Sequence, residues 1–274
     1  MKKILLVFDG IHYSEGAFEF ARMMNETERV MITGVFLPQV DYANLWSHSA
    51  GTSGALFIPM LEDEEADVIQ KNISRFERSC RNNLVQYRVH KDFFDLALPE
   101  LIKETRFADL VILGSELFYK NLGAYEPNDY LKEALHEAEC PVLVVPEHFD
   151  FPDSTVLAYD GSASSMYAIK QFVYLFPWMR RNKTLLVYVN DTNEKLLPDE
   201  LQLKEWAGRH FPDLTIMKLE IDPKKYFATW IGDRKNTILV TGAYGRSSFS
   251  QFFKKSFVTD VIHDHRLPVF ITHR

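Results

Sequence analysis

The sequence predicts an α/β fold in which two five-stranded, doubly wound parallel sheets follow one another along the chain. Three observations indicate it. Segments of the first half recur in order in the second half, short apolar strands alternate with helix-length amphipathic segments, and the strands are apolar throughout. Apolar strands separated by helices are typical of a parallel sheet covered on both faces. We therefore expect one domain over residues 1–149 and another over residues 150–274.

The internal repeat consists of three pairs of matching segments, which we read as a tandem duplication. The pairs are ILLVFDG at 4–10 with TVLAYDG at 155–161, ADLVILG at 108–114 with NTILVTG at 236–242, and CPVLVVPE at 140–147 with LPVFITHR at 267–274.

The spacing of these pairs predicts an insertion in the first half. The offset falls from 151 to 128 residues between the first and second pairs. The polar, Gly- and Ser-rich stretch 38–59 lies in that interval and is predicted to be a surface loop. The segment PEHFDFPDS at 146–154, with two prolines and three acids, is the predicted linker.

Each half is expected to contain five strands, and the second half is the clearer. Its predicted strands are Thr155–Tyr159, Thr184–Val189, Leu214–Glu220, Thr237–Thr241 and Val269–Thr272. Its predicted helices are Ser164–Phe176, Asp199–His210, Lys224–Ile231 and Phe252–His263. Ser164 is the expected N-cap of the first of these helices, and Pro198 suits the first turn of the second. In the first half, Leu61–Asn83 is predicted to be a long charged helix.

Composition excludes several classes of protein. The chain has 274 residues, 46% of them apolar and 25% charged, as in ordinary globular proteins. The apolar opening at residues 4–8 is too short for a signal peptide or a membrane span, so a cytoplasmic protein is expected. Two unclustered thiols, Cys80 and Cys140, provide neither a disulfide framework nor a zinc site. His263 and His265 are two residues apart and do not share a helix face, so no metal site is predicted.

The charge is unevenly distributed between the halves. The net charge is −7, with 14 Lys and Arg against 24 Asp and Glu in residues 1–149, and 17 against 14 in residues 150–274. An acidic chain argues against nonspecific binding of nucleic acid, which needs a basic face. If the chain binds an anionic ligand, the second half is the better candidate.

The position of a ligand site follows from the predicted sheet. In doubly wound folds, ligands lie beyond the carboxyl ends of the strands, where the strand order reverses. The acid after the first strand, Asp9 or Asp160, and the glycine after the fourth strand, Gly114 or Gly242, fall at that edge. No Walker motif and no arrangement typical of nucleophilic catalysis is present, so we predict a protein that is not an enzyme.

These motifs together resemble those of the universal stress protein family, over essentially the whole chain. The resemblance lies in a first strand ending in Asp-Gly-Ser, a late strand followed by Gly-x-x-Gly, and a last strand introduced by Cys-Pro-Val. It implies the Rossmann-like, adenine nucleotide alpha hydrolase-like form of the α/β fold, with ATP or a related nucleotide bound by some members. It also implies dimers through the last strand, a contact that a tandem chain could make internally.

Carried over residue by residue, the resemblance implies a nucleotide site in the second half. Its glycine motif is Gly242-Ala-Tyr-Gly245, followed by nine residues and then Lys255-Ser256, with Lys255 in place of the family's glycine. Glycines let backbone N–H groups approach phosphate closely. Lys255 would either crowd this position or contact phosphate through its ammonium group. The residues assigned to the site are Asp160, Ser162, Val189, Gly242, Gly245, Arg246, Lys255 and Ser256.

The first half departs further from the motif. Gly114-Ser-Glu-Leu117 lacks the second glycine, and Asn128-Asp129 replaces the Gly-Ser pair. A carboxylate at a phosphate position is repulsive, so the first half is not expected to bind nucleotide.

Alternatives remain open at this point. Asp9 and Asp160 are equally suited to forming a turn after a strand, and the glycines to a strand-to-helix connection. A nucleotide-free scaffold that binds an unidentified protein partner through the acidic first half and the region of Trp46 is the second hypothesis, and a slow nucleotide hydrolase is the weakest. A homodimer of intact chains also remains open.

Overall fold

The chain folds around one sheet of ten strands in a mostly parallel α/β arrangement. The structure is a computed structural model that describes residues 1–8, 10–36, 63–90, 97–118, 137–188, 197–219, 223–242, 261–262 and 266–272. In the first half the elements are β1 Lys2–Phe8, α1 Glu15–Thr27, β2 Val30–Phe36, α3 Asp63–Asn82, β3 Gln86–His90, α4 Ala97–Thr105, β4 Leu110–Gly114, the 3-10 helix η1 Ser115–Phe118 and β5 Val142–Val145. In the second half they are β6 Ser154–Tyr159, α6 Ala163–Leu175, the 3-10 helix η2 Pro177–Arg181, β7 Lys183–Tyr188, α7 Glu200–His210, β8 Leu214–Lys218, α8 Pro223–Gly232, β9 Thr237–Gly242 and β10 Val269–Thr272.

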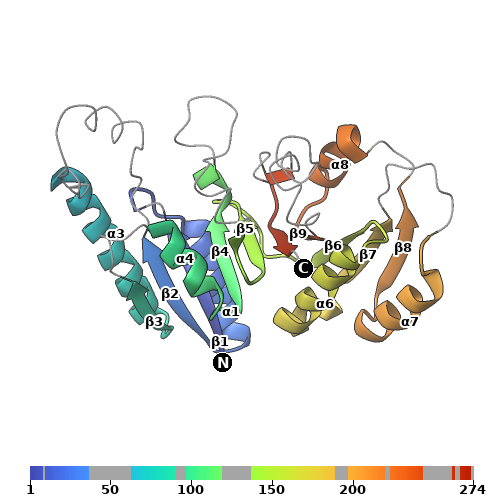
Figure 1. The fold of residues 1–274 in the computed structure, drawn as a ribbon, viewed down its shortest axis with the longest axis horizontal. Helices are drawn as coiled ribbons and strands as arrows, with labels where there is room; N and C mark the ends of the chain where they lie inside the picture. The colour runs from blue at the N-terminus through green and yellow to red at the C-terminus, as the bar shows by residue number, and fades with distance from the viewer. Residues whose placement is uncertain are drawn as a thin grey trace, which may run out of the picture.

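The strand order is β3-β2-β1-β4-β5-β10-β9-β6-β7-β8. The strands of the first half therefore form one block and those of the second half another, as the blue-to-green and yellow-to-red strands show (Figure 1). Read from its outer edge inward, each block has its third, second, first, fourth and fifth strand in turn, and all pairs within a block are parallel. The same order in both blocks agrees with the repeat in the sequence.

The two blocks meet through their last strands. β5 and β10 pair antiparallel, with Val142 opposite Ile271 and Val144 opposite Val269. The contact through the last strand, which the resemblance implies, is thus made within this chain, between Val142–Val145 and Val269–Thr272. Because this pairing makes one continuous sheet, the division of the chain into two domains stays a prediction.

Helices cover both faces of the sheet, as a doubly wound fold requires. Alternate strand residues enter two separate hydrophobic clusters: Ile4, Leu6 and Phe8 lie in one, and Leu5 and Val7 in the other. The first cluster includes buried side chains of α1, α3, α6 and α7, and the second includes those of α4 and α8. Side chains on a strand point alternately to opposite faces, which explains why these strands are apolar at every position.

Aromatic side chains join the two halves beneath the β5–β10 pair. Phe20 of α1 packs on Phe149 and Phe151 of the linker, with ring centroids 5.8 and 5.3 Å away, and on Phe176 at the end of α6, 6.2 Å away. Phe176 also contacts Phe270 of β10 at 5.6 Å. Phe20, Phe176 and Phe270 are fully buried. The halves therefore share one apolar core on this face of the sheet.

Most predicted elements of the second half agree with the structure to within one or two residues, but two local predictions are wrong. The N-cap of α6 is Ser162 and not Ser164, because the Ser162 hydroxyl accepts the hydrogen bond of the Ser165 amide at 3.1 Å. Pro198 lies before α7 and outside its first turn, since Asp199 is the N-cap. The loop at 38–59 and most of the predicted helix Phe252–His263 lie outside the described residues.

Within the described ranges, no helix combines the length and the apolar character that crossing a bilayer requires.

Candidate functional site

The carboxyl ends of β6 and β9 form the edge at which the sequence predicts the ligand. β6 and β9 are neighbours in the sheet, and they are the first and fourth strands of their block, between which the strand order reverses. After β6 the chain turns through Asp160 and Gly161 into α6. The Asp160 carboxylate accepts a hydrogen bond from the Ser162 amide at 2.9 Å. Gly161 has a φ of +85°, a conformation that side chains disfavour.

Ser162 closes this turn as the N-cap of α6, so two of the predicted site residues have local structural roles. A carboxylate that bonds a backbone amide two residues on is an Asx turn, which was the alternative interpretation of this acid. The turn fixes both oxygen-bearing side chains at the end of β6. They lie at the predicted edge, and their local bonds do not depend on a ligand.

Gly242, the last residue of β9, lies directly against the start of α6. A β-carbon at this position would be 2.6 Å from the carbonyl carbon of Ser164 and from the nitrogen of Ser165. Only glycine fits at this approach of strand and helix. The structure thus brings together Asp160, Ser162 and Gly242, three of the residues that the sequence assigns to the site.

The remaining assigned residues, Val189, Gly245, Arg246, Lys255 and Ser256, lie outside the described residues. The same holds for Asp9, Asn128 and Asp129 in the first half and for His263 and His265.

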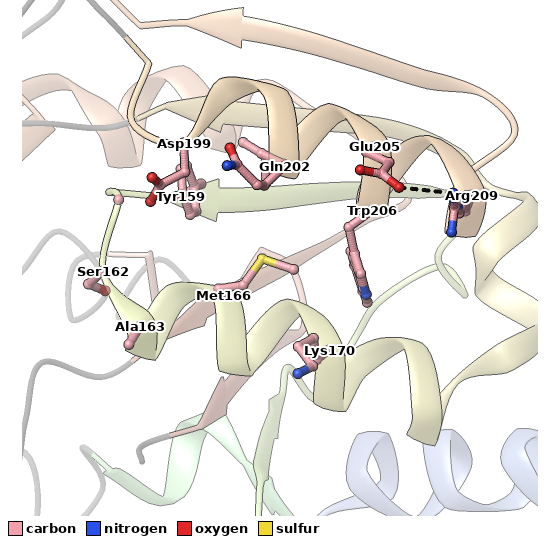
Figure 2. A pocket seen from close by; sticks show the side chains of 12 residues that line it. Tyr159, Ser162, Ala163, Met166, Lys170, Asp199, Gln202, Glu205, Trp206 and Arg209 are labelled. Atoms are coloured by element: carbon pink, nitrogen blue, oxygen red, sulfur yellow. Dashed lines mark hydrogen bonds and ion pairs between the residues drawn. The ribbon is translucent and has the colours of Figure 1, made fainter.

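A groove of about 780 Å³ runs between α6 and α7 and opens at the same edge. Figure 2 shows Tyr159, Ser162 and Asp199 at one end of this α6–α7 groove, and Lys170, Trp206 and Arg209 at the other. Its lining consists of Tyr159, Gly161, Ser162, Ala163, Met166, Lys170, Asp199, Gln202, Leu203, Glu205, Trp206 and Arg209. A concave, largely apolar surface with a few polar groups is the usual form of a small-molecule site.

Tyr159 is the titratable group that distinguishes the end of the groove near β6. Burial raises the pKa of its phenol above the ordinary value, and the nearby carboxylates of Asp199 and Asp160 raise it further. Its hydroxyl lies 3.5 Å from the carbonyl oxygen of Pro198. The phenol is therefore neutral at physiological pH, and its O–H donates to the Pro198 carbonyl oxygen beside two acidic side chains.

The corresponding helix of the first half begins against an acid of its own chain. The Glu147 carboxylate, in the linker, accepts hydrogen bonds from the Ser14 hydroxyl at 2.8 Å, the Glu15 amide at 2.7 Å and the Gly16 amide at 3.4 Å. The Glu147 amide in turn donates to the Glu116 carboxylate at 2.9 Å. The start of α1, where exposed amides favour an anion, is thus occupied by a side chain of the protein.

The two thiols of the chain, Cys80 and Cys140, both lie within the described residues. Burial raises the pKa of the Cys80 and Cys140 thiols to about 12, which leaves both poorly nucleophilic. Within the same residues, no cluster of three or more His, Cys, Asp or Glu side chains could hold a metal ion.

Sequence reasoning missed the α6–α7 groove and the role of Glu147. The groove residues of α6 and α7 recur at helical spacing, for example Ala163, Met166 and Lys170, or Leu203 and Trp206. That spacing identifies one face of a helix, but it does not reveal whether another element of the protein covers that face. Glu147 was recognised as one of three linker acids, and nothing local connects it with α1.

The comparisons with known proteins identify the fold. No protein-family model matches the chain. A universal stress protein from Archaeoglobus fulgidus DSM 4304 is structurally similar with a TM-score of 0.66 at 15% identity, covering 100% of this chain and 96% of that one. A functionally unknown protein from Pseudomonas aeruginosa PAO1 matches with a TM-score of 0.58, 12% identity and coverages of 100% and 92%. A putative universal stress protein from Pseudomonas aeruginosa UCBPP-PA14 matches with a TM-score of 0.55, 13% identity and coverages of 100% and 93%. The chain therefore has the α/β fold found in universal stress proteins.

Proposed function

We propose that this chain is a universal-stress-protein-like stress-response protein made of two tandem domains, and that its second half binds ATP or a related adenine nucleotide. We assign it no catalytic activity. The nucleotide would lie at the carboxyl ends of β6 and β9, with Asp160 and Ser162 on one side and the segment that begins at Gly242 on the other.

One observation carries this proposal: the contact between Gly242 and the start of α6 at the point where the strand order reverses. A backbone that approaches a helix N-terminus this closely can direct amide groups at an anion, and the helix adds positive potential. The two motifs are far apart in sequence, and the fold brings them to one edge. The α6–α7 groove opens at that edge and leaves room for a base.

The first half lacks this arrangement, which supports a single site per chain. Glu147 occupies the start of α1 with its carboxylate, and a second anion there would meet like charge. In the sequence, Asp129 replaces the serine of the Gly-Ser pair, so its carboxylate would repel phosphate as well.

The proposal is tested by titrating the intact chain with ATP in a calorimeter, with substitutions at Lys255. If Lys255 crowds the phosphate position, Lys255→Gly strengthens binding, because the backbone can then reach the phosphate. If its ammonium group contacts phosphate, Lys255→Ala weakens binding and Lys255→Glu abolishes it. Either effect is about tenfold or more. Lys71→Ala, an exposed lysine of α3, is the control. We expect the first pattern, with one nucleotide per chain.

The second candidate function is a nucleotide-free scaffold. The observation in its favour is that Asp160 and Ser162 already serve a turn and a helix cap. Two results together would replace the nucleotide-binding proposal with the scaffold. Neither the native chain nor Lys255→Gly binds ATP, and mass spectrometry detects no nucleotide released from the purified protein on denaturation.

A further inference from the structure

The α6–α7 groove has an acidic end and a basic end, and the nucleotide proposal makes no use of this difference in charge. Asp199 precedes the first turn of α7 and Arg209 is in its last turn, ten residues later. At a rise of about 1.5 Å per residue, these two positions are about 15 Å apart along the helix. The acidic end lies beside Tyr159 at the end of β6, and the basic end lies beside Lys170 (Figure 2).

Two cations line the basic end, Arg209 and Lys170, and within the described part of the chain only the first of them is ion-paired. Arg209 is paired with Glu205 at 2.9 Å, and Lys204 is paired with Glu200, all on α7. Lys170 of α6 is exposed, and it has no ion-pair partner among the residues that the structure describes. The ammonium group of Lys170 can therefore accept an anionic partner without breaking an existing pair.

The surface between the two ends is apolar and firmly held. Leu203 is buried, and Met166 and Trp206 are partly buried against the core of the sheet face. The Trp206 ring packs on His210, with centroids 4.2 Å apart. Figure 2 shows Trp206 and Met166 directed into the space between the two helices. An indole held in this way offers a flat face to a planar apolar group.

We propose that the α6–α7 groove binds a small aromatic carboxylic acid, with its ring on Trp206, Met166 and Leu203 and its carboxylate at Lys170. The charges set the orientation, because a carboxylate at the opposite end would meet Asp199. A neutral ligand of the same shape gains only the apolar contact, and a cation bound in the same orientation is repelled by Lys170. This ligand position lies farther along the helices than the proposed nucleotide position and does not depend on it.

The test uses the intact chain and 2-naphthoate as the probe, with the uncharged 2-naphthalenemethanol as its matched control. We expect 2-naphthoate to bind with a Kd of about 1 mM or tighter, as a ligand of this size allows, and to change the fluorescence of Trp206. Trp206→Phe removes the fluorescence change. Lys170→Met keeps the aliphatic part of the side chain and removes the charge, and we expect it to weaken 2-naphthoate binding about fivefold. Lys71→Met is the control on another exposed helical lysine.

Three results would overturn this inference: no saturable binding of 2-naphthoate, equal affinity for the acid and the alcohol, or no effect of Lys170→Met. A loss of ATP affinity in Lys170→Met, without naphthoate binding, would assign the basic end to nucleotide phosphate and contradict the inference as well. The nucleotide proposal has its own test: it fails if neither the native chain nor any Lys255 variant binds ATP, whatever the result with 2-naphthoate. Both lysine variants are at exposed positions, so far-UV circular dichroism is expected to match that of the native chain.

Discussion

Replacing Glu147 should destabilise the protein, because this linker carboxylate caps a helix that lies far away in the sequence. Glu147→Ala removes the acceptor of the Ser14 hydroxyl at 2.8 Å and of the Glu15 amide at 2.7 Å, and leaves the start of α1 without its anion. A hydrogen bond to a charged group contributes about 1.5–3 kcal/mol when buried, and an anion at a helix N-terminus contributes about 0.3–1 kcal/mol; the N-cap of α1, Ser14, is retained in the variant. Glu147 is only partly buried, so we expect the free energy of unfolding to fall by about 2 kcal/mol.

The measurement is urea unfolding followed by far-UV circular dichroism, combined with hydrogen exchange. Glu147→Gln keeps one oxygen acceptor and loses the charge, so about half of the effect is expected. The Glu15 amide should exchange faster in Glu147→Ala, whereas the Ser165 amide, capped by Ser162 in α6, should be unchanged.

Asp150→Ala is the matched control, since Asp150 is an exposed acid of the same linker. It should change stability by no more than about 0.5 kcal/mol. If Glu147→Ala and Asp150→Ala have equal stability, or if exchange at the start of α1 is unaffected, Glu147 does not cap α1 in solution and the reasoning is refuted.

Three further predictions concern the core and the thiols. Gly242→Ala should lower the free energy of unfolding by about 1–3 kcal/mol in urea titrations, because the new β-carbon would lie 2.6 Å from the backbone of α6. The control is Gly208→Ala, which should be neutral or slightly stabilising because its β-carbon would have no neighbour within 4 Å. Phe176→Ala should cost about 3–5 kcal/mol by opening a cavity between the halves, and the exposed Tyr174→Ala should cost much less; equal losses would contradict the shared core. Since burial raises the pKa of Cys140 to about 12, alkylation of the native protein by iodoacetamide at pH 8 should be much slower than that of the urea-unfolded chain, and equal rates would contradict its burial.

The sequence by itself determined the strands, the order of the repeated segments and the joint between the halves. Val142–Val145 and Val269–Thr272 were recognised as apolar strands that end their copies, and an apolar edge strand favours pairing. Helix positions in the second half followed from local periodicity, which depends only on neighbouring residues. Gly242 was placed at the right edge of the sheet, although its reason is steric: it lets β9 approach α6.

Only the tertiary structure decided what depends on residues far apart in the chain. Glu147 contacts a hydroxyl 133 residues away, and no local pattern could indicate that this acid, and not the neighbouring Asp150, caps α1. The N-cap of α6 is Ser162, two residues before the predicted Ser164, because the Asx turn at Asp160 starts the helix earlier than the hydrophobic pattern suggests. The α6–α7 groove exists because no described element covers the facing sides of those two helices. A sequence period gives the direction of a side chain, and only the packing of distant elements determines whether that side chain meets the core, a partner or open space.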